Sequence, residues 1–288
     1  MDRRQRTKTI KYMKYLLILV LTAAWLFPVY WLIVTSLKTR LDMFAIPPKW
    51  FNFQPILDNF IDVFYEHRYG LTPGPTDFPR FLLNSFFISL SSIALVILVG
   101  MLASYSFSRF NVKGKDTWLF FILSTRMLPP IAIIIPIYFM YQRLELLNNY
   151  FGLIALYVMF NMAFAVWMMK GFFDEIPREL DDAAMVDGYS RLGAFRKAVL
   201  PQALSGIAAT AVFCLIMAWN EFLFAYILSG FDTRTVPVAL SRIRGESGIN
   251  WGTITATEVL YITPVIIFTF FLQKYLLRGI TFGTVKGK

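Results

Sequence analysis

The chain has 288 residues, of which 57% are hydrophobic and 16% are charged, and its mean hydropathy is +0.56. This composition is too apolar for an ordinary water-soluble domain, so we expect the chain to lie in a bilayer. The net charge of +10 does not indicate nucleic-acid binding, because the Lys and Arg residues lie in short segments between apolar runs and form no basic face with interleaved aromatic residues.

Six apolar runs are each long enough to cross the hydrocarbon core, which needs about 20 residues as a helix. They predict an all-α integral membrane protein in which residues 1–288 form a single membrane domain. Pro129, Pro130 and Pro136 interrupt the third run, so a kink, an early end or a re-entrant stretch is open there. The predicted spans are residues 15–37, 81–107, 118–140, 151–170, 204–228 and 257–277.

The first run follows a basic stretch that begins at Arg3, so a cleaved signal peptide is the alternative to a membrane span. The run is too long for a signal peptide, however, and it continues through Pro28 to Leu37 without a clear small-residue cleavage site. We therefore expect a retained signal-anchor helix.

The distribution of positive charge predicts the orientation. The side that holds both termini carries 18 Lys and Arg residues, against 9 on the other side. Because the richer side of a membrane protein is cytoplasmic, both termini are expected inside, in a multi-pass protein. The polar segments 38–80 and 229–256 then face outward.

The chain has one cysteine, Cys214, and one histidine, His67. An intramolecular disulfide is excluded, and most metal sites and His-based relays lose their ligands. Cys214 is interpreted as a packing residue and His67 as a solvated loop residue. Without an HExxH or GxSxG pattern an intramembrane enzyme is disfavoured, and without a GxxxxGK[ST] loop any ATP must be bound by another chain.

The segment between the fourth and fifth runs, residues 171–203, is long and amphipathic. Pro177 precedes a short helix whose first turns hold Glu179, Asp181 and Asp182, where carboxylates favour the positive end of the helix dipole. Leu180, Ala183, Ala184 and Asp187 share one face of this helix. Gly188 is expected to end it, because glycine adopts the left-handed cap conformation without strain.

A second short helix is predicted to begin with Ser190 as N-cap and to end before Pro201, with Arg196 and Lys197 in its last turns. The small side chains of Ala183 and Ala184 would let another protein approach the backbone closely, which favours docking. The open alternative is an amphipathic linker that lies on the membrane surface.

This segment resembles the EAA loop of ABC importer permeases, in which Glu-Ala-Ala is followed after three residues by Gly and after nine more by Ile, any residue and Leu-Pro. The chain keeps the spacing with Asp182-Ala183-Ala184, Gly188 and Leu200-Pro201, but Asp182 replaces Glu and Ala198 replaces Ile. The resemblance identifies a cytoplasmic coupling helix and implies ATPase docking by Asp182, Ala183, Ala184, Asp187, Gly188, Leu200 and Pro201.

Most of the chain resembles the carbohydrate-importer permeases of the maltose type, through PVYWLIVTSLK, RFLLNSFFIS, TRMLPP, LLNNYFGLI, AWNEFLFAYIL and FAIPPKW. The resemblance implies the type I ABC importer permease fold, in a subunit that carries a sugar, an oligosaccharide or a polyol and is not itself an enzyme. It also implies a homologous second permease, two copies of a cytoplasmic ATPase that binds ATP and Mg, and an extracytoplasmic solute-binding protein.

Polar residues within the runs are candidates for the solute path, because a charge that faces lipid is expensive. Asn220 and Glu221 in the fifth run are the first candidates, with an interhelical hydrogen bond or a contact with the second permease as the alternatives. Tyr157 and Asn161 in the fourth run are weaker candidates. Arg126 is interpreted as a donor to carbonyls freed by Pro129 and Pro130.

A different class of function is retained as the alternative, an ion-coupled secondary transporter or channel subunit that acts without an ATPase. Membrane carboxylates such as Glu221 and Glu258 could relay protons in such a protein. Two further points are open from the sequence: the 38–80 loop either touches the binding protein or shields the cavity, and the 281–288 tail either reaches the ATPase or is a frayed end.

Overall fold

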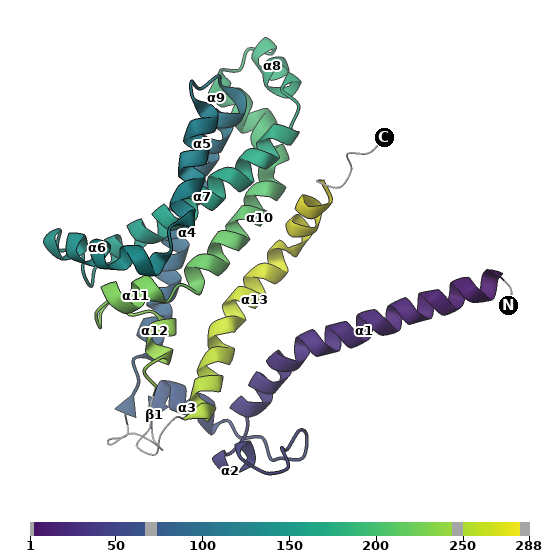
Figure 1. Cartoon of the computed structure of the whole chain (residues 1–288), viewed down its shortest axis with the longest axis vertical. Coiled ribbons are helices and arrows are strands. Elements are labelled where there is room, and N and C mark those ends of the chain that lie inside the picture. Colours follow the sequence, from purple (N-terminus) through teal and green to yellow (C-terminus); the bar gives the residue numbers. More distant parts are fainter. Residues whose placement is uncertain (1–2, 67–73, 244–249, 283–288) are drawn as a thin grey trace. The chain divides into compact units, whose positions relative to one another are not determined.

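A computed structural model describes residues 3–66, 74–243 and 250–282 of the chain, and most of these residues are helical (Figure 1). Their contacts divide the chain into two compact units, which are described separately. The first comprises Met1–Asp77 and Ile243–Ile262, and the second comprises Phe78–Arg242 and Thr263–Lys288. The single domain expected over 1–288 stays a prediction.

The first unit begins with one long apolar helix and continues with short elements. Its elements are α1 (Arg3–Ser36), α2 (Arg40–Met43), α3 (Asp58–Phe64), β1 (Tyr65–Glu66), β2 (Gly74–Pro75) and the first turns of α13 (Trp251–Phe282). The two strands form a short antiparallel pair with Tyr65 opposite Pro75. Most large apolar side chains of α1 are exposed, which suits a helix in apolar surroundings.

The turn after α1 is fastened by buried polar contacts. Asn59 of α3 donates hydrogen bonds to the carbonyl oxygens of Ser36 and Lys38, both at 2.9 Å. The side chain of Lys38 is buried, and its ammonium group lies 4.4 Å from the ring centroid of Trp31. These contacts stabilise the turn by satisfying backbone carbonyls that would otherwise be buried without a partner.

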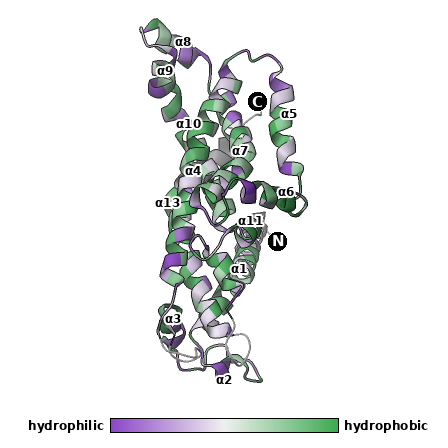
Figure 2. Cartoon of the chain, turned by 90° about the vertical axis from the view of Figure 1, so that its left-hand side faces the viewer, coloured by the Kyte–Doolittle hydropathy of each residue, from purple (hydrophilic) through white to green (hydrophobic). Residues whose placement is uncertain are grey.

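The second unit contains the remaining elements. These are α4 (Phe78–Arg109), α5 (Lys115–Ser124), η1 (Thr125–Met127), α6 (Pro130–Arg143), α7 (Tyr150–Glu175), α8 (Glu179–Val186), α9 (Arg191–Ala194), η2 (Phe195–Val199), α10 (Leu200–Trp219), α11 (Leu223–Leu228), α12 (Val236–Leu240) and the rest of α13. Figure 2 shows hydrophobic residues along α4 and α10 and hydrophilic residues on α8.

Three helices, α4, α7 and α10, form the core of the second unit. A Cβ atom added at Gly206 of α10 would lie 2.1 Å from the Phe172 ring of α7, so these helices approach as closely as they do because residue 206 is glycine. The hydroxyl of Ser104 in α4 donates to the carbonyls of Gly100 and Val166, which satisfies it within the apolar core. Residues of α4, α6, α7, α10 and α11 complete one buried apolar cluster.

Within residues 3–66, 74–243 and 250–282, five helices are long and apolar enough to cross a membrane, and the number rises to six if a bent helix pair counts as one span. The five are Lys11–Ser36, Phe78–Arg109, Tyr150–Glu175, Arg191–Trp219 and Trp251–Gln273. This agrees with the prediction of six spans in an all-helical membrane protein. The fourth predicted span ended too early, because α7 continues to Glu175.

The bent pair is the third predicted span. Lys115–Met127 and Pro130–Arg143 meet at an angle of 93°, so the break expected at Pro129 and Pro130 is confirmed, whereas Pro136, also expected to interrupt the run, lies inside α6. Leu128 and Pro129 are extended, because a residue that precedes proline avoids the helical conformation. Pro130 then begins α6, at a position where its missing N–H costs little.

The fifth predicted span, 204–228, is also wrong as a single helix, because α10 ends at Trp219 and α11 begins at Leu223. The second short helix of the 171–203 segment does not end before Pro201. It continues from α9 through η2 into α10, and η2 is a π-helical turn. We attribute this continuation to the wider turn, which accommodates Pro201 although proline has no N–H to donate.

Candidate functional site

The three residues between α10 and α11 leave the helical path. The Asn220 side chain donates to the Ile216 carbonyl at 2.8 Å. The Glu221 carboxylate accepts hydrogen bonds from the N–H groups of Phe224 at 2.9 Å and Ala225 at 3.1 Å. Glu221 therefore caps the first turn of α11, where a negative charge is favourable. Irregular backbone within an apolar stretch is tolerated where it is buried in protein or lines a cavity.

A cavity of about 340 Å³ lies beside this break. It brings together three of the four residues that the sequence predicted for the solute path, Tyr157, Asn161 and Glu221. Asn220 does not line it. The remaining lining residues are Arg126, Leu128, Pro130, Phe160, Met217 and Phe224.

The cavity wall combines hydrogen-bonding groups with an aromatic surface. The Asn161 amide nitrogen donates to the Tyr157 carbonyl at 2.9 Å. Asn161 is 4% exposed, and its Oδ1 atom has no hydrogen-bond partner within the described part of the chain. The rings of Phe160 and Phe224 lie 4.5 Å apart with an interplanar angle of 34°. The wall therefore combines a buried amide oxygen with an apolar ring face.

Arg126 has a different role from the one expected. Its Nη1 donates to the Phe160 carbonyl in α7 at 2.7 Å, and its Nη2 donates to the Met217 sulfur in α10 at 3.0 Å. The expectation that it bonds carbonyls freed by Pro129 and Pro130 is therefore not supported by these contacts. Arg126 instead places a guanidinium group in the cavity wall.

The predicted coupling segment forms the expected helix, turn and second helix start. Gly188 has a φ of +89°, and the Ser190 hydroxyl accepts from the Gly193 N–H at 3.2 Å. Asp182, Ala183 and Asp187 are exposed, but Ala184 is buried. Ala183 and Ala184 therefore lie on different sides of α8, contrary to the prediction that they share one open face.

The other residues near the docking face also differ in exposure. Val186, which was not predicted as a docking residue, is 87% exposed and extends the outer face of α8. Leu200 is partly buried, and Pro201 is exposed at the start of α10.

The buried side of α8 carries a charged cluster that the sequence analysis missed. Arg109, the last residue of α4, donates from Nε to Asp181 Oδ2 at 2.8 Å, and these side chains are 6% and 10% exposed. The Tyr105 hydroxyl donates to Asp181 Oδ1 at 2.6 Å. We call Tyr105, Arg109 and Asp181 the latch. The sequence signal for it is an arginine at the end of an apolar run, which is also what the positive charge of a cytoplasmic loop produces.

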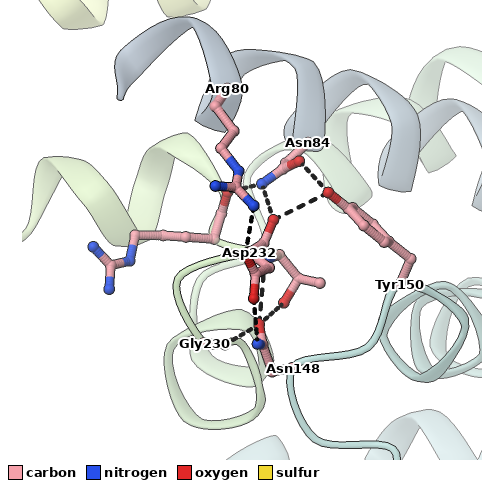
Figure 3. Close-up of polar contacts among 8 residues, drawn as sticks. Arg80, Asn84, Asn148, Tyr150, Gly230 and Asp232 are labelled. Atoms are coloured by element: carbon pink, nitrogen blue, oxygen red, sulfur yellow. Dashed lines mark hydrogen bonds and ion pairs between the residues drawn. The ribbon is translucent and has the colours of Figure 1, made fainter. Parts of the chain in front are cut away.

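The loop between α11 and α12 is held at the opposite end of α4 (Figure 3). Asn148 Oδ1 accepts from the Gly230 N–H at 2.9 Å and the Thr233 hydroxyl at 3.0 Å, and Asn148 Nδ2 donates to Asp232 at 3.0 Å. Arg80 forms an ion pair with Asp232. We call Arg80, Asn148 and Asp232 the clip.

Two further groups support the same loop. Asn84 Nδ2 donates to the carbonyls of Asp232 and Arg234 at 2.8 and 2.9 Å. The Tyr150 hydroxyl donates to Asn84 Oδ1 at 2.7 Å (Figure 3). The loop therefore depends on polar side chains from both α4 and α7.

His67 and residues 283–288 of the predicted C-terminal tail lie outside the described residues, so their open interpretations stand as stated. Cys214 is buried in α10, which agrees with its interpretation as a packing residue.

Comparison with known proteins gives a consistent result. A family model described as a binding-protein-dependent transport system inner membrane component matches residues 96–282. The "Probable ABC transporter permease protein y4oR" of Sinorhizobium fredii is 38% identical over 93% of this chain and 92% of that protein. A permease protein of the sulfoquinovosyl glycerol transport system of Agrobacterium fabrum is 33% identical over 96% of this chain and 94% of that protein.

The fold has a counterpart among solved structures. A bacterial ABC transporter involved in the import of the acidic polysaccharide alginate matches with a TM-score of 0.73 at 21% identity, over 96% of this chain and 98% of that one. At this level of identity the match shows that the fold is that of an ABC importer permease.

Proposed function

Because the chain belongs to the inner-membrane components of binding-protein-dependent transport systems, we propose that it forms part of the path by which an ATP-driven importer moves a sugar, oligosaccharide or polyol. In this proposal ATP and Mg bind to a separate ATPase present in two copies. A homologous second permease completes the membrane path, and an extracytoplasmic protein delivers the solute. Both termini lie in the cytoplasm.

The observation that carries the proposal is the geometry of α8. This short helix and its C-cap present Asp182, Ala183 and Asp187 outward, while Asp181 on the other face is bonded to Tyr105 and Arg109 at the end of α4. A helix with one open face and one anchored face can accept another protein without being detached from its own chain. The docking set is the one given by the motif, Asp182, Ala183, Ala184, Asp187, Gly188, Leu200 and Pro201. Within this set Ala184 is buried on the inner side of α8.

The cavity beside the α10–α11 break supports a sugar or polyol as the solute. Such molecules have many hydroxyl groups around apolar ring or chain faces. Asn161 and Glu221 supply oxygen acceptors, and the ring pair Phe160 and Phe224 supplies a flat apolar surface. We assign solute contact to Tyr157, Asn161 and Glu221, and we give Asn220 a supporting role because it does not line the cavity.

The first experiment purifies the chain from detergent-solubilised native membranes and identifies the proteins that accompany it. A second permease and an active ATPase are expected with the native chain. Gly188→Trp should leave insertion intact but reduce uptake, because residue 188 has a positive φ and follows the docking face. Gly171→Trp is the matched control, since Gly171 also has open space around it but lies in α7.

The outcomes of this experiment separate the two classes of function. Normal uptake by Gly188→Trp would contradict a coupling role for the segment. A chain that purifies alone and still transports would instead favour the ion-coupled transporter.

A second experiment tests the cavity. Asn161→Leu keeps the approximate volume but removes the buried acceptor, so we expect uptake at limiting solute to fall about tenfold, as for the loss of one good hydrogen bond. Asn220→Ala should have a smaller effect, because Asn220 contacts its own helix instead of the cavity. Equal effects of the two variants, or none, would remove Asn161 from the path.

A further inference from the structure

The latch binds α8 to α4 through charged groups that each hold several partners. Arg109 uses Nε for Asp181, Nη1 for the Phe173 carbonyl at 3.0 Å and Nη2 for the Ile176 carbonyl at 2.8 Å. Both carboxylate oxygens of Asp181 are also occupied, by Arg109 and by Tyr105. Because this ion pair is almost fully buried, solvent screens it little, so separating α8 from α4 would break an ion pair and several hydrogen bonds to charged groups at once.

The ends of α4 and α7 are also joined to each other. Arg109 of α4 donates to carbonyls at the end of α7, and Arg178, which precedes α8, donates to the Ser108 carbonyl at the end of α4 at 2.8 Å. The Ser108 hydroxyl donates to Asp174 of α7 at 2.7 Å. Cationic groups at helix C-termini are favoured by the helix dipole, so each arginine stabilises the end that it contacts.

Aromatic packing extends the connection to the helix that leads into α10. The Tyr105 ring lies 5.8 Å from the ring of Phe173 in α7 and 4.5 Å from that of Phe195 in η2. Phe173 and Phe195 are buried, and their centroids are 6.2 Å apart. Tyr105 thus contacts α7 and η2 with its ring and α8 with its hydroxyl.

We propose that Arg109 and Asp181 are positioning residues that join α8 to α4, so that a displacement of α8 carries the ends of α4 and α7 with it as one body. This inference rests on the proposed docking of an ATPase at α8. It adds α4, the second membrane helix, to the part of the chain that moves. The connection between α7 and α8 is then not a hinge, because Arg109 bonds the Phe173 carbonyl in α7, the Ile176 carbonyl within the connection and the Asp181 side chain in α8.

The direct test measures the distance between α8 and α4 in the intact complex with its ATPase. Spin labels are placed at Glu179→Cys in α8 and Leu102→Cys in α4, both exposed and outside the docking set, while Cys214 is buried. The distance distribution should be the same in the nucleotide-free and the ATP-trapped complex. A shift in the native complex on trapping would overturn the inference, because α8 would then move independently of α4.

A second variant tests the role of the charge. Asp181→Asn keeps the shape and leaves the docking face unchanged, so the ATPase should still co-purify and hydrolyse ATP. Solute uptake for each ATP hydrolysed should fall about tenfold, because a weakened joint transmits less of the movement. Asp232→Asn is the matched control, since the same substitution breaks the Arg80–Asp232 pair at the other end of α4 without touching α8.

The outcomes distinguish this inference from the function on which it rests. If the ratio of uptake to ATP hydrolysis is unchanged in Asp181→Asn, the proposed connection between α8 and α4 is wrong. It is also wrong if ATPase binding falls in proportion to uptake, because that result indicates a purely structural role for Asp181. Failure of the native chain to bind any ATPase would overturn the proposed function itself.

Discussion

The two ends of α4 are fastened to neighbouring loops in opposite ways. At its C-terminal end the latch pairs Arg109 with Asp181, whose side chains are 6% and 10% exposed. Near its N-terminal end the clip pairs Arg80 with Asp232, whose side chains are 45% and 59% exposed. Both are ion pairs between Arg and Asp, but water competes for one of them and is excluded from the other.

This difference determines what each contact contributes. An exposed pair is screened by solvent, so it orients a loop without strongly stabilising it. A buried pair is costly to form and still more costly to break one partner at a time. The latch is therefore suited to holding α8 in a fixed position, whereas the loop of the clip depends mainly on the neutral hydrogen bonds of Asn148.

The largest expected effect is at the latch. Arg109→Leu leaves the Asp181 carboxylate buried without its cation and removes two donors from the end of α7, so we expect a loss of about 3–5 kcal/mol in stability. Thermal unfolding in detergent measures it. The double variant Arg109→Leu with Asp181→Leu should recover part of the loss, because no charge remains buried. A double variant less stable than the single one would contradict this account.

The next effect is at Asn148 in the clip. Asn148→Ala removes the acceptor for Gly230 and Thr233 and places a Cβ-bearing residue without a polar side chain at a φ of +50°, so we expect a loss of about 2 kcal/mol. Asn148→Gly removes the same hydrogen bonds but relieves the backbone strain, so it should be less destabilising. Equal losses in the two variants would assign the whole effect to the hydrogen bonds.

A smaller effect is expected from acid. Hydrogen bonds from Asn148 and then from Arg80 hold the pKa of Asp232 below its ordinary value. A depressed pKa contributes stability above the ordinary carboxyl pKa, and this contribution is lost as the pH falls through the folded value. A pH series of thermal unfolding should therefore show an acid-dependent decrease below about pH 4 that Asp232→Asn reduces. The same decrease in the native chain and in Asp232→Asn would mean that another group causes the acid dependence.

The smallest effect is expected at Arg80. Arg80→Gln removes the exposed ion pair but leaves the Asn148 and Asn84 hydrogen bonds of the loop in place. The unfolding midpoint should be nearly unchanged, and added salt should remove what difference there is, because exposed pairs are screened. A loss of stability as large as that of Arg109→Leu would contradict the proposed difference between the exposed and the buried ion pair of α4.

Local features of the fold were easier to predict from the sequence than contacts between distant segments. Features that depend on neighbouring residues were predicted well. Pro129 and Pro130 predicted the break in the third span, Gly188 predicted the end of α8, and Ser190 predicted the next N-cap. Each of these residues acts through its own backbone or through a partner within a few positions, so the local sequence contains the cause.

Features that depend on a distant partner, or on a side chain that turns back to cap a helix within an apolar stretch, were missed. Glu221 was predicted inside a continuous span, but its carboxylate bonds the N–H groups that begin α11. Residue hydrophobicity alone gives no sign of that break, because both flanks are apolar. Tyr157 and Asn161 were predicted for the path, yet only packing placed them in one cavity with Glu221 and Arg126.

By itself the sequence indicated an all-helical membrane chain with six candidate spans, a break at Pro129 and Pro130, a helix end at Gly188 and the family motif between the fourth and fifth spans. These follow from the length of apolar runs and from local backbone chemistry. The tertiary structure alone decided that Arg109 pairs with Asp181, that Ala184 faces inward while Ala183 faces outward, and that span five breaks beside a cavity. Such outcomes depend on which surfaces meet when helices pack, and no single stretch of sequence contains that information.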